Sequence, residues 1–101
     1  GTMKINITGH HVNITDALNL YINSKFQKLK KYSENIISVN AILNVEKERM
    51  RAEATLKTKH GNLFAVGEKE NMYTAIDEII EKLDRQLKKQ KEKIINYRRM
   101  E

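Results

Sequence analysis

Residues 73–93 contain neither glycine nor proline, and their apolar side chains recur at intervals of three and four positions. Asn71, whose side chain can accept a hydrogen bond from the backbone, precedes this segment. The pattern predicts an amphipathic helix of more than about 20 residues, roughly 30 Å long. Its apolar stripe consists of Met72, Ile76, Ile79, Ile80, Leu83 and Leu87. Since a chain of 101 residues must bury this stripe against a layer of its own, we expect one domain of two layers.

Four segments show the alternation of apolar and polar residues that is typical of half-buried strands. They are residues 3–8, 37–45, 51–57 and 63–67. In the second segment the side chains expected to face the core are Ile37, Val39, Ala41, Leu43 and Val45. The charged residues 46–49 predict a hairpin connection, and residues 60–62 predict another turn. The last three segments should therefore form an antiparallel meander.

A shorter helical pattern lies between the first two strand segments. Thr15 can cap its start, and its apolar face continues to about Tyr32 through Leu18, Ile22, Phe26 and Leu29. A helix that connects two strands of one sheet makes them parallel neighbours. The order β-α-β-β-β-α thus predicts an α+β fold, a two-layer sandwich in which both helices pack on one face of a four-stranded mixed sheet.

We expect the domain to span residues 3–93. Gly1 and Thr2 precede the first methionine and are interpreted as the remnant of a removed tag. Residues 94–101 lose the helical periodicity, so we expect a basic, flexible tail. The chain has no cysteine, and its longest apolar run has four residues, at 63–66. We therefore expect no thiolate metal site, no membrane span and, by default, a cytoplasmic protein. The sequence leaves the oligomeric state open, and a monomer is taken as the first expectation.

Positive charge is concentrated near the end of the chain. The chain has 19 lysines and arginines against 13 aspartates and glutamates, and residues 82–99 alone hold eight bases and two acids. That segment accounts for the entire surplus of +6. Segregated positive charge indicates a polyanionic partner, with nucleic acid the first candidate and a membrane surface the second.

A helical projection sorts these charges by side. On the last helix the bases form one flank and Asp77, Glu81 and Asp84 the other. The candidate RNA-binding residues are Lys82, Arg85, Lys89 and Lys93 on this helix, and Tyr21, Lys25, Lys28 and Tyr32 on the first. Two basic ridges with interleaved tyrosines would suit phosphates and bases on one common outer surface. Alternatively, the lysines are an ordinary solvated face, and the tyrosines are edge-of-core residues with a wet hydroxyl.

Other functional classes find less support in the sequence. His10, His11 and His60 are interpreted as turn residues, because no acidic or sulfur ligand lies at zinc spacing. No nucleophile elbow or glycine-rich phosphate loop occurs, so we expect no catalysis. Ile42, Phe64 and Val66 should lie on the sheet face away from the helices. They could serve a protein partner or a homodimer, or be ordinary exposed apolar residues.

Several motifs together resemble the sigma-54 modulation family, which comprises the bacterial ribosome hibernation promoting factors and the sister ribosome-associated inhibitors. The supportive motifs are residues 3–9 (MKINITG), which run into residues 12–16, and residues 25–29 (KFQKL). The specific motif is residues 71–77 (NMYTAID), continued by residues 82–89 (KLDRQLKK). The resemblance covers residues 3 to about 93.

The resemblance implies a fold related to double-stranded-RNA-binding domains, and binding in the small-subunit channel that messenger and transfer RNA otherwise occupy. It implies that translation is blocked by occupancy, without catalysis or a cofactor, and that inactive ribosome dimers form with a separate modulation factor. Carried over by position, the bases that contact rRNA would be Lys25, Lys28, Lys82, Arg85, Lys89 and Lys93.

Two departures from the family bear on this interpretation. Asn71 stands where the family often has aspartate, and no second, dimerising domain follows, so the chain looks like the short form. The sister inhibitor tends to have a longer acidic tail, whereas residues 91–101 are basic, which favours the hibernation promoting member. Two alternatives stay open: an inhibitor that stabilises single inactive ribosomes, and a general double-stranded-RNA-binding protein.

Overall fold

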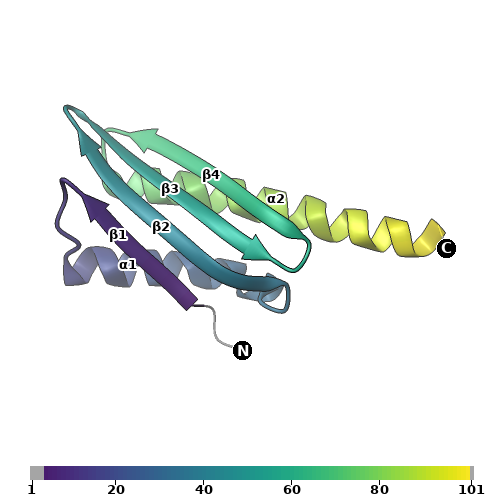
Figure 1. The fold of residues 1–101 in the computed structure, drawn as a ribbon. Coiled ribbons are helices and arrows are strands. Elements are labelled where there is room, and N and C mark those ends of the chain that lie inside the picture. Colours follow the sequence, from purple (N-terminus) through teal and green to yellow (C-terminus); the bar gives the residue numbers. More distant parts are fainter. Residues whose placement is uncertain (1–3, 101) are drawn as a thin grey trace.

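A computed structural model describes the backbone of residues 4–100 and the side chains of residues 5–95. Its elements follow the order that the sequence predicts (Figure 1). They are β1 (Lys4–His10), α1 (Asp16–Phe26), the 3-10 helix η1 (Gln27–Tyr32), β2 (Ile36–Glu46), β3 (Arg49–Thr58), β4 (Gly61–Lys69) and α2 (Met72–Met100). The predicted strand position at Met3 lies outside the described residues.

The four strands form one mixed sheet in the order β1-β2-β3-β4. β1 runs parallel to β2, because α1 and η1 carry the chain back across the sheet, and the other two pairs are antiparallel. Both helices lie on the same face of the sheet (Figure 1). The predicted α+β two-layer sandwich is therefore confirmed.

The core lies between the sheet and the two helices. Every apolar position predicted for the helical stripes is buried, and Phe26, Leu29, Ile76 and Leu83 are 0% exposed. α2 also approaches β4 closely at Gly67, where an added Cβ would lie 2.5 Å from the carbonyl oxygen of Ala75. Glycine at this position lets the backbones of α2 and β4 come together without a clash.

Both predicted N-caps are confirmed. The Thr15 hydroxyl accepts a 3.1 Å hydrogen bond from the Leu18 amide at the start of α1. The Asn71 side-chain oxygen accepts a 2.7 Å bond from the Tyr73 amide at the start of α2. Each cap satisfies one of the backbone donors that have no partner within the first helical turn.

The predicted orientation of Ile37 is wrong. Its side chain is 51% exposed, and Ile36 occupies the core position instead, at 8% exposure. The β2–β3 register shifts between Ile36 and Ser38, which makes Ile37 the extra residue of a β-bulge. A bulge reverses the inside-outside alternation on one side of it, so counting backwards from Val39 gives the wrong face.

The helix ends also differ from the expectation. α1 ends at Phe26 and continues as the tighter η1 to Tyr32. α2 does not end near Lys93 but continues to Met100, beyond the end of the sheet (Figure 1). The residues after Lys93 include no glycine or proline, so nothing in the sequence interrupts the backbone hydrogen-bond ladder.

Candidate nucleic-acid interface

One flank of α2 carries the predicted cations, and we call Lys82, Arg85, Lys89 and Lys93 the α2 basic flank. It lies beside β4: the Lys82 ammonium donates to the carbonyl oxygen of Val66 at 2.6 Å, and the Gln86 amide donates to that of Phe64 at 3.0 Å. Lys82, Arg85 and Lys89 line a shallow depression with Gln86. These three cations therefore meet on one surface.

The cations of the α2 basic flank differ in how far they are neutralised. Lys82 forms a 3.0 Å ion pair with Glu78, and Lys69 lies 3.4 Å from the same carboxylate. The hydrogen bond from Lys82 is the main reason why the pKa of Glu78 is lowered. Arg85, Lys89 and Lys93 are exposed, and no carboxylate within residues 5–95 pairs with them. Within the α2 basic flank, these three side chains therefore carry positive charge that no neighbouring carboxylate neutralises.

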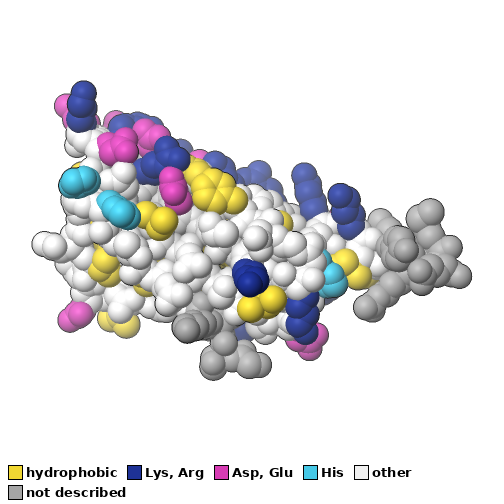
Figure 2. All heavy atoms as spheres, in the orientation of Figure 1, with side chains coloured by type: hydrophobic (Ala, Val, Ile, Leu, Met, Phe, Trp, Pro, Cys, Tyr) yellow, Lys and Arg dark blue, Asp and Glu magenta, His cyan; other side chains and the backbone are white. Residues whose placement is uncertain are grey.

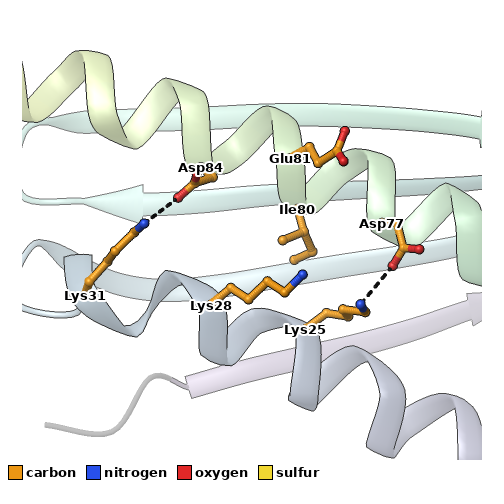
Figure 3. A pocket seen from close by; sticks show the side chains of 7 residues that line it. All are labelled: Lys25, Lys28, Lys31, Asp77, Ile80, Glu81 and Asp84. Carbon is orange, nitrogen blue, oxygen red and sulfur yellow. Dashed lines mark ion pairs between the residues drawn. The ribbon is translucent and has the colours of Figure 1, made fainter.

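The predicted bases of the first helix occupy a different place. They line a groove between the two helices, which we call the interhelical groove (Figure 3). Its volume is about 460 Å³, and its lining consists of Lys25, Lys28, Lys31, Asp77, Ile80, Glu81 and Asp84. The α2 carboxylates thus face the α1 and η1 lysines across the groove.

Two ion pairs cross the interhelical groove. Lys25 lies 3.6 Å from Asp77, and Lys31 lies 3.4 Å from Asp84 (Figure 3). Asp77 is the main reason why the pKa of Lys25 is raised. Lys28 projects into the groove between these pairs (Figure 3), and it forms no ion pair with any described carboxylate.

Tyr21 supports this arrangement from α1. Its hydroxyl donates a 2.6 Å hydrogen bond to Asp77, and its ring packs edge-on against Tyr73 with centroids 4.8 Å apart. The Lys25 ammonium lies 5.2 Å from the centre of the same ring. Because the hydroxyl hydrogen-bonds to a carboxylate, the pKa of Tyr21 is raised. Tyr21 therefore connects the two helices in addition to being a candidate contact residue.

Tyr32 is a core residue. It is 7% exposed, and burial raises the pKa of its hydroxyl. Its ring is therefore not an open stacking platform, and of the two interpretations of this residue the structure supports the edge-of-core one. The Lys31 ammonium lies 5.3 Å from the ring centre and covers it further.

The expectation that both basic ridges form one common surface is corrected by this geometry. Asp77, Glu81 and Asp84 lie between the lysines of the interhelical groove and the α2 basic flank. A helical projection finds the charged flanks of each helix, but it does not tell which flank faces the neighbouring helix. Here the acidic flank of α2 faces α1, as attraction between opposite charges favours.

The turn between β3 and β4 adds residues that the sequence did not indicate as binding residues. A second hollow of about 370 Å³ opens there, beside the depression described above. It is lined by His60, Leu63, Gln86, Lys89, Gln90 and Lys93. The prediction of turn residues is confirmed for His60 and wrong for His10, which is the last residue of β1 and pairs with Asn44 of β2. The closeness of His60 to Lys93 follows only from the crossing of β4 and α2, and no local pattern signals it.

The apolar residues of the open sheet face do not form a continuous patch. Ile42 and Phe64 are 37% and 53% exposed. In the sheet register, however, Glu53 lies between Ile42 and Val66, and it accepts a 2.6 Å hydrogen bond from Arg51. Figure 2 shows this face, with hydrophobic side chains scattered over it. The arrangement favours the interpretation that these are ordinary exposed residues.

The described residues offer no metal site and no membrane-spanning helix. Within residues 5–95 no three histidine or carboxylate side chains gather as they would around an ion. No helix in the described part of the chain is long and apolar enough to cross a bilayer.

Comparison with known proteins places the chain in a family. The model of the family described as "Sigma 54 modulation protein / S30EA ribosomal protein" matches residues 5–95. The chain belongs to this family. The match spans α1, the four strands from residue 5 onward, and α2 as far as residue 95, including every cation of the α2 basic flank.

Relatives of known name are similar over nearly their full length. The ribosome hibernation promoting factor of Salmonella typhimurium is 46% identical over 92 residues, which cover 91% of this chain and 97% of the relative. That of Azotobacter vinelandii is 45% identical over 93 residues, or 92% and 87% of the two chains. Both carry the same protein name.

Two solved structures agree with the fold. A ribosomal subunit interface protein from Coxiella burnetii superposes with a TM-score of 0.83 at 27% identity, covering 89% of this chain and 98% of the other. The Protein Y N-terminal domain from Thermus thermophilus superposes with a TM-score of 0.81 at 27% identity, covering 86% and 98%.

Proposed function

We propose that this chain is a ribosome hibernation factor that acts in the cytoplasm by binding the small ribosomal subunit. It lies against rRNA in the channel that messenger and transfer RNA otherwise occupy, and it prevents translation by occupancy. It makes and breaks no covalent bond and needs no cofactor. The observation that carries the proposal is the 46% identity, over 97% of its length, to a relative named ribosome hibernation promoting factor.

The charge distribution supports an RNA partner. Arg85, Lys89 and Lys93 are exposed cations on one helix, and Lys82 borders them. Such a row can follow phosphates, because each neutralised phosphate releases condensed counterions. We assign the first contact with rRNA to the α2 basic flank. Lys25 and Lys28, with Tyr21 behind them, contribute where RNA reaches the interhelical groove.

A general double-stranded-RNA binder is the main competing function. It would use the same cations, so charge alone does not separate the two. Competition between intact small subunits and an isolated RNA duplex does, because a hibernation factor prefers the subunit even when the duplex offers more phosphate. Equal competition per phosphate would favour the general binder.

We further propose that binding favours inactive ribosome dimers, formed together with a separate modulation factor. The alternative is an inhibitor that stabilises single inactive ribosomes. A sucrose-gradient profile of ribosomes with added protein, with and without a candidate modulation factor, separates dimers, single ribosomes and free subunits in one measurement.

The decisive test reverses two charges of the α2 basic flank. Arg85→Glu with Lys89→Glu should abolish co-sedimentation with small subunits, since both side chains are exposed and the fold should be unaffected. Lys47→Glu with Lys57→Glu is the matched control, because it changes the net charge equally at two exposed positions of the β2–β3 hairpin. If the Arg85/Lys89 variant co-sediments like wild type, the α2 basic flank is not the contact surface.

A further inference from the structure

The hollow at the β3–β4 turn combines side chains that the interhelical groove lacks. It joins an imidazole and an apolar side chain, from His60 and Leu63, to two lysines of α2, Lys89 and Lys93. Its volume of about 370 Å³ lies within the range of pockets that hold small organic groups, about 300–1,000 Å³. The interhelical groove, by contrast, is lined by three carboxylates.

One buried hydroxyl organises the rim of this hollow. Thr58, which is 5% exposed, donates a hydrogen bond to the carbonyl oxygen of Gly61 at 2.5 Å and accepts one from the His60 amide at 3.1 Å. It also accepts a 3.2 Å bond from the Gln90 amide of α2. The turn that carries His60 is thereby tied to the helix that carries Lys89 and Lys93. A site tied together in this way loses little entropy when a ligand binds.

The side chains around the hollow suit the parts of a nucleotide. His60 is exposed, so its ring is available as a stacking surface, and the half-buried Leu63 adds an apolar contact. Lys89 and Lys93 are four residues apart on one helix face, are exposed, and form no ion pair with the described carboxylates. Single-stranded RNA is recognised by this combination, in which bases stack on aromatic rings while cations hold the backbone.

We propose that this hollow binds one unstacked ribonucleotide of the rRNA, with its base against His60 and Leu63 and its flanking phosphates at Lys89 and Lys93. The inference rests on the proposed function and deepens it, since it assigns a single-stranded nucleotide, rather than a duplex, to one end of the α2 basic flank. It also assigns a binding role to His60, which the sequence indicated only as a turn residue.

The test is a double-mutant cycle, in which one change is made in the protein and the other in the RNA. The probe is a fluorescently labelled five-nucleotide RNA, prepared with a normal or an abasic central nucleotide, and binding is followed by anisotropy. Wild type should bind the normal RNA about fivefold or more tightly than the abasic RNA, the lower end of what stacking of one base contributes. In His60→Ala this preference should disappear.

Two further variants identify what His60 supplies. His60→Phe keeps a stacking ring without nitrogen atoms and should retain the preference, whereas His60→Lys introduces a cation without a ring and should lose it. His10→Ala is the matched control, because His10 is also exposed but lies in the sheet register at the end away from the β3–β4 turn. An unchanged preference in His60→Ala would overturn the proposal, as would retention in His60→Lys with loss in His60→Phe.

Co-sedimentation with small subunits separates this inference from the proposed function. If wild type does not co-sediment, the hibernation assignment fails whatever the short RNA does. If wild type co-sediments while the short-RNA preference is the same in wild type and His60→Ala, only the nucleotide site fails. His60→Ala should bind subunits about fivefold more weakly if both are correct.

Discussion

The hydroxyl of Tyr21 donates a 2.6 Å hydrogen bond to Oδ1 of Asp77, and the same oxygen lies 3.6 Å from the ammonium of Lys25. One carboxylate of α2 thus binds two side chains of α1, of which Tyr21 is 56 positions away in the chain. The contact stabilises the packing of the two helices, and it also decides how much of the charge of Lys25 an RNA can reach.

Tyr21→Phe should therefore destabilise the fold without weakening the α2 basic flank. Loss of a hydrogen bond to a charged group at a half-buried position should cost about 1 kcal/mol in the free energy of unfolding. Urea unfolding measures this cost. Co-sedimentation of the folded variant with small subunits should stay close to wild type; a large loss there would mean that the Tyr21 hydroxyl itself contacts RNA.

Asp77→Asn should strengthen RNA binding at low salt. It removes a carboxylate from the interhelical groove and frees Lys25 from its partner. We expect the slope of log affinity on log salt to steepen by up to about 0.9, the value of one additional phosphate contact. Anisotropy titrations with an RNA duplex measure the slope. Glu48→Gln, which removes an exposed charge at the β2–β3 turn, is the control and should leave the slope unchanged.

The Glu78 carboxylate predicts a specific acid sensitivity. Lys82 lowers the pKa of Glu78 in the folded state below the ordinary value of 4.5, so Glu78 stabilises the fold at higher pH. That contribution is fully present above the pKa of the unfolded state and is lost as the pH falls through the lower pKa of the folded state. Below about pH 4.5 wild type should thus lose stability more steeply than Glu78→Gln. Urea midpoints measured between neutral pH and this range compare the two; parallel curves would contradict the prediction.

Gly67→Ala should push α2 away from β4 at this contact and destabilise the fold. The new methyl group would lie 2.5 Å from the carbonyl oxygen of Ala75, and backbone on both sides has little room to move. We expect a loss of about 1–3 kcal/mol, as for other overpacked sites. Thermal unfolding measures it, with Ser24→Ala on the exposed side of α1 as the control. A variant as stable as wild type would show that α2 shifts easily on β4.

Glu53→Leu should create the apolar patch that wild type lacks. The substitution would join Ile42 and Val66 across β3 and leave Arg51 without its ion pair. Larger continuous apolar surfaces promote association. Sedimentation velocity should show monomeric wild type and concentration-dependent association of the variant. Association of wild type by itself would overturn the expectation of a monomer.

The elements and their buried faces could be predicted because they depend on local geometry. Leu18, Ile22 and Phe26 recur at helical spacing, and Thr15 and Asn71 precede the helices that they cap. Ile37 could not be placed, because the bulge in β2 arises only where this strand pairs with β3. The extension of α2 to Met100 was missed because the apolar periodicity ends near Lys93, whereas the helical backbone continues as long as no residue breaks it.

The features of the candidate site also fall into those that local geometry predicts and those that depend on packing. The sequence by itself determined that α2 has a basic and an acidic flank, because the positions of Lys82, Arg85 and Lys89 around one helix follow from the helical repeat alone. Only the tertiary structure decided that Asp77 faces Lys25 and that His60 lies beside Lys93. Side chains on different elements become neighbours through the way those elements pack, and no spacing within the chain encodes that distance.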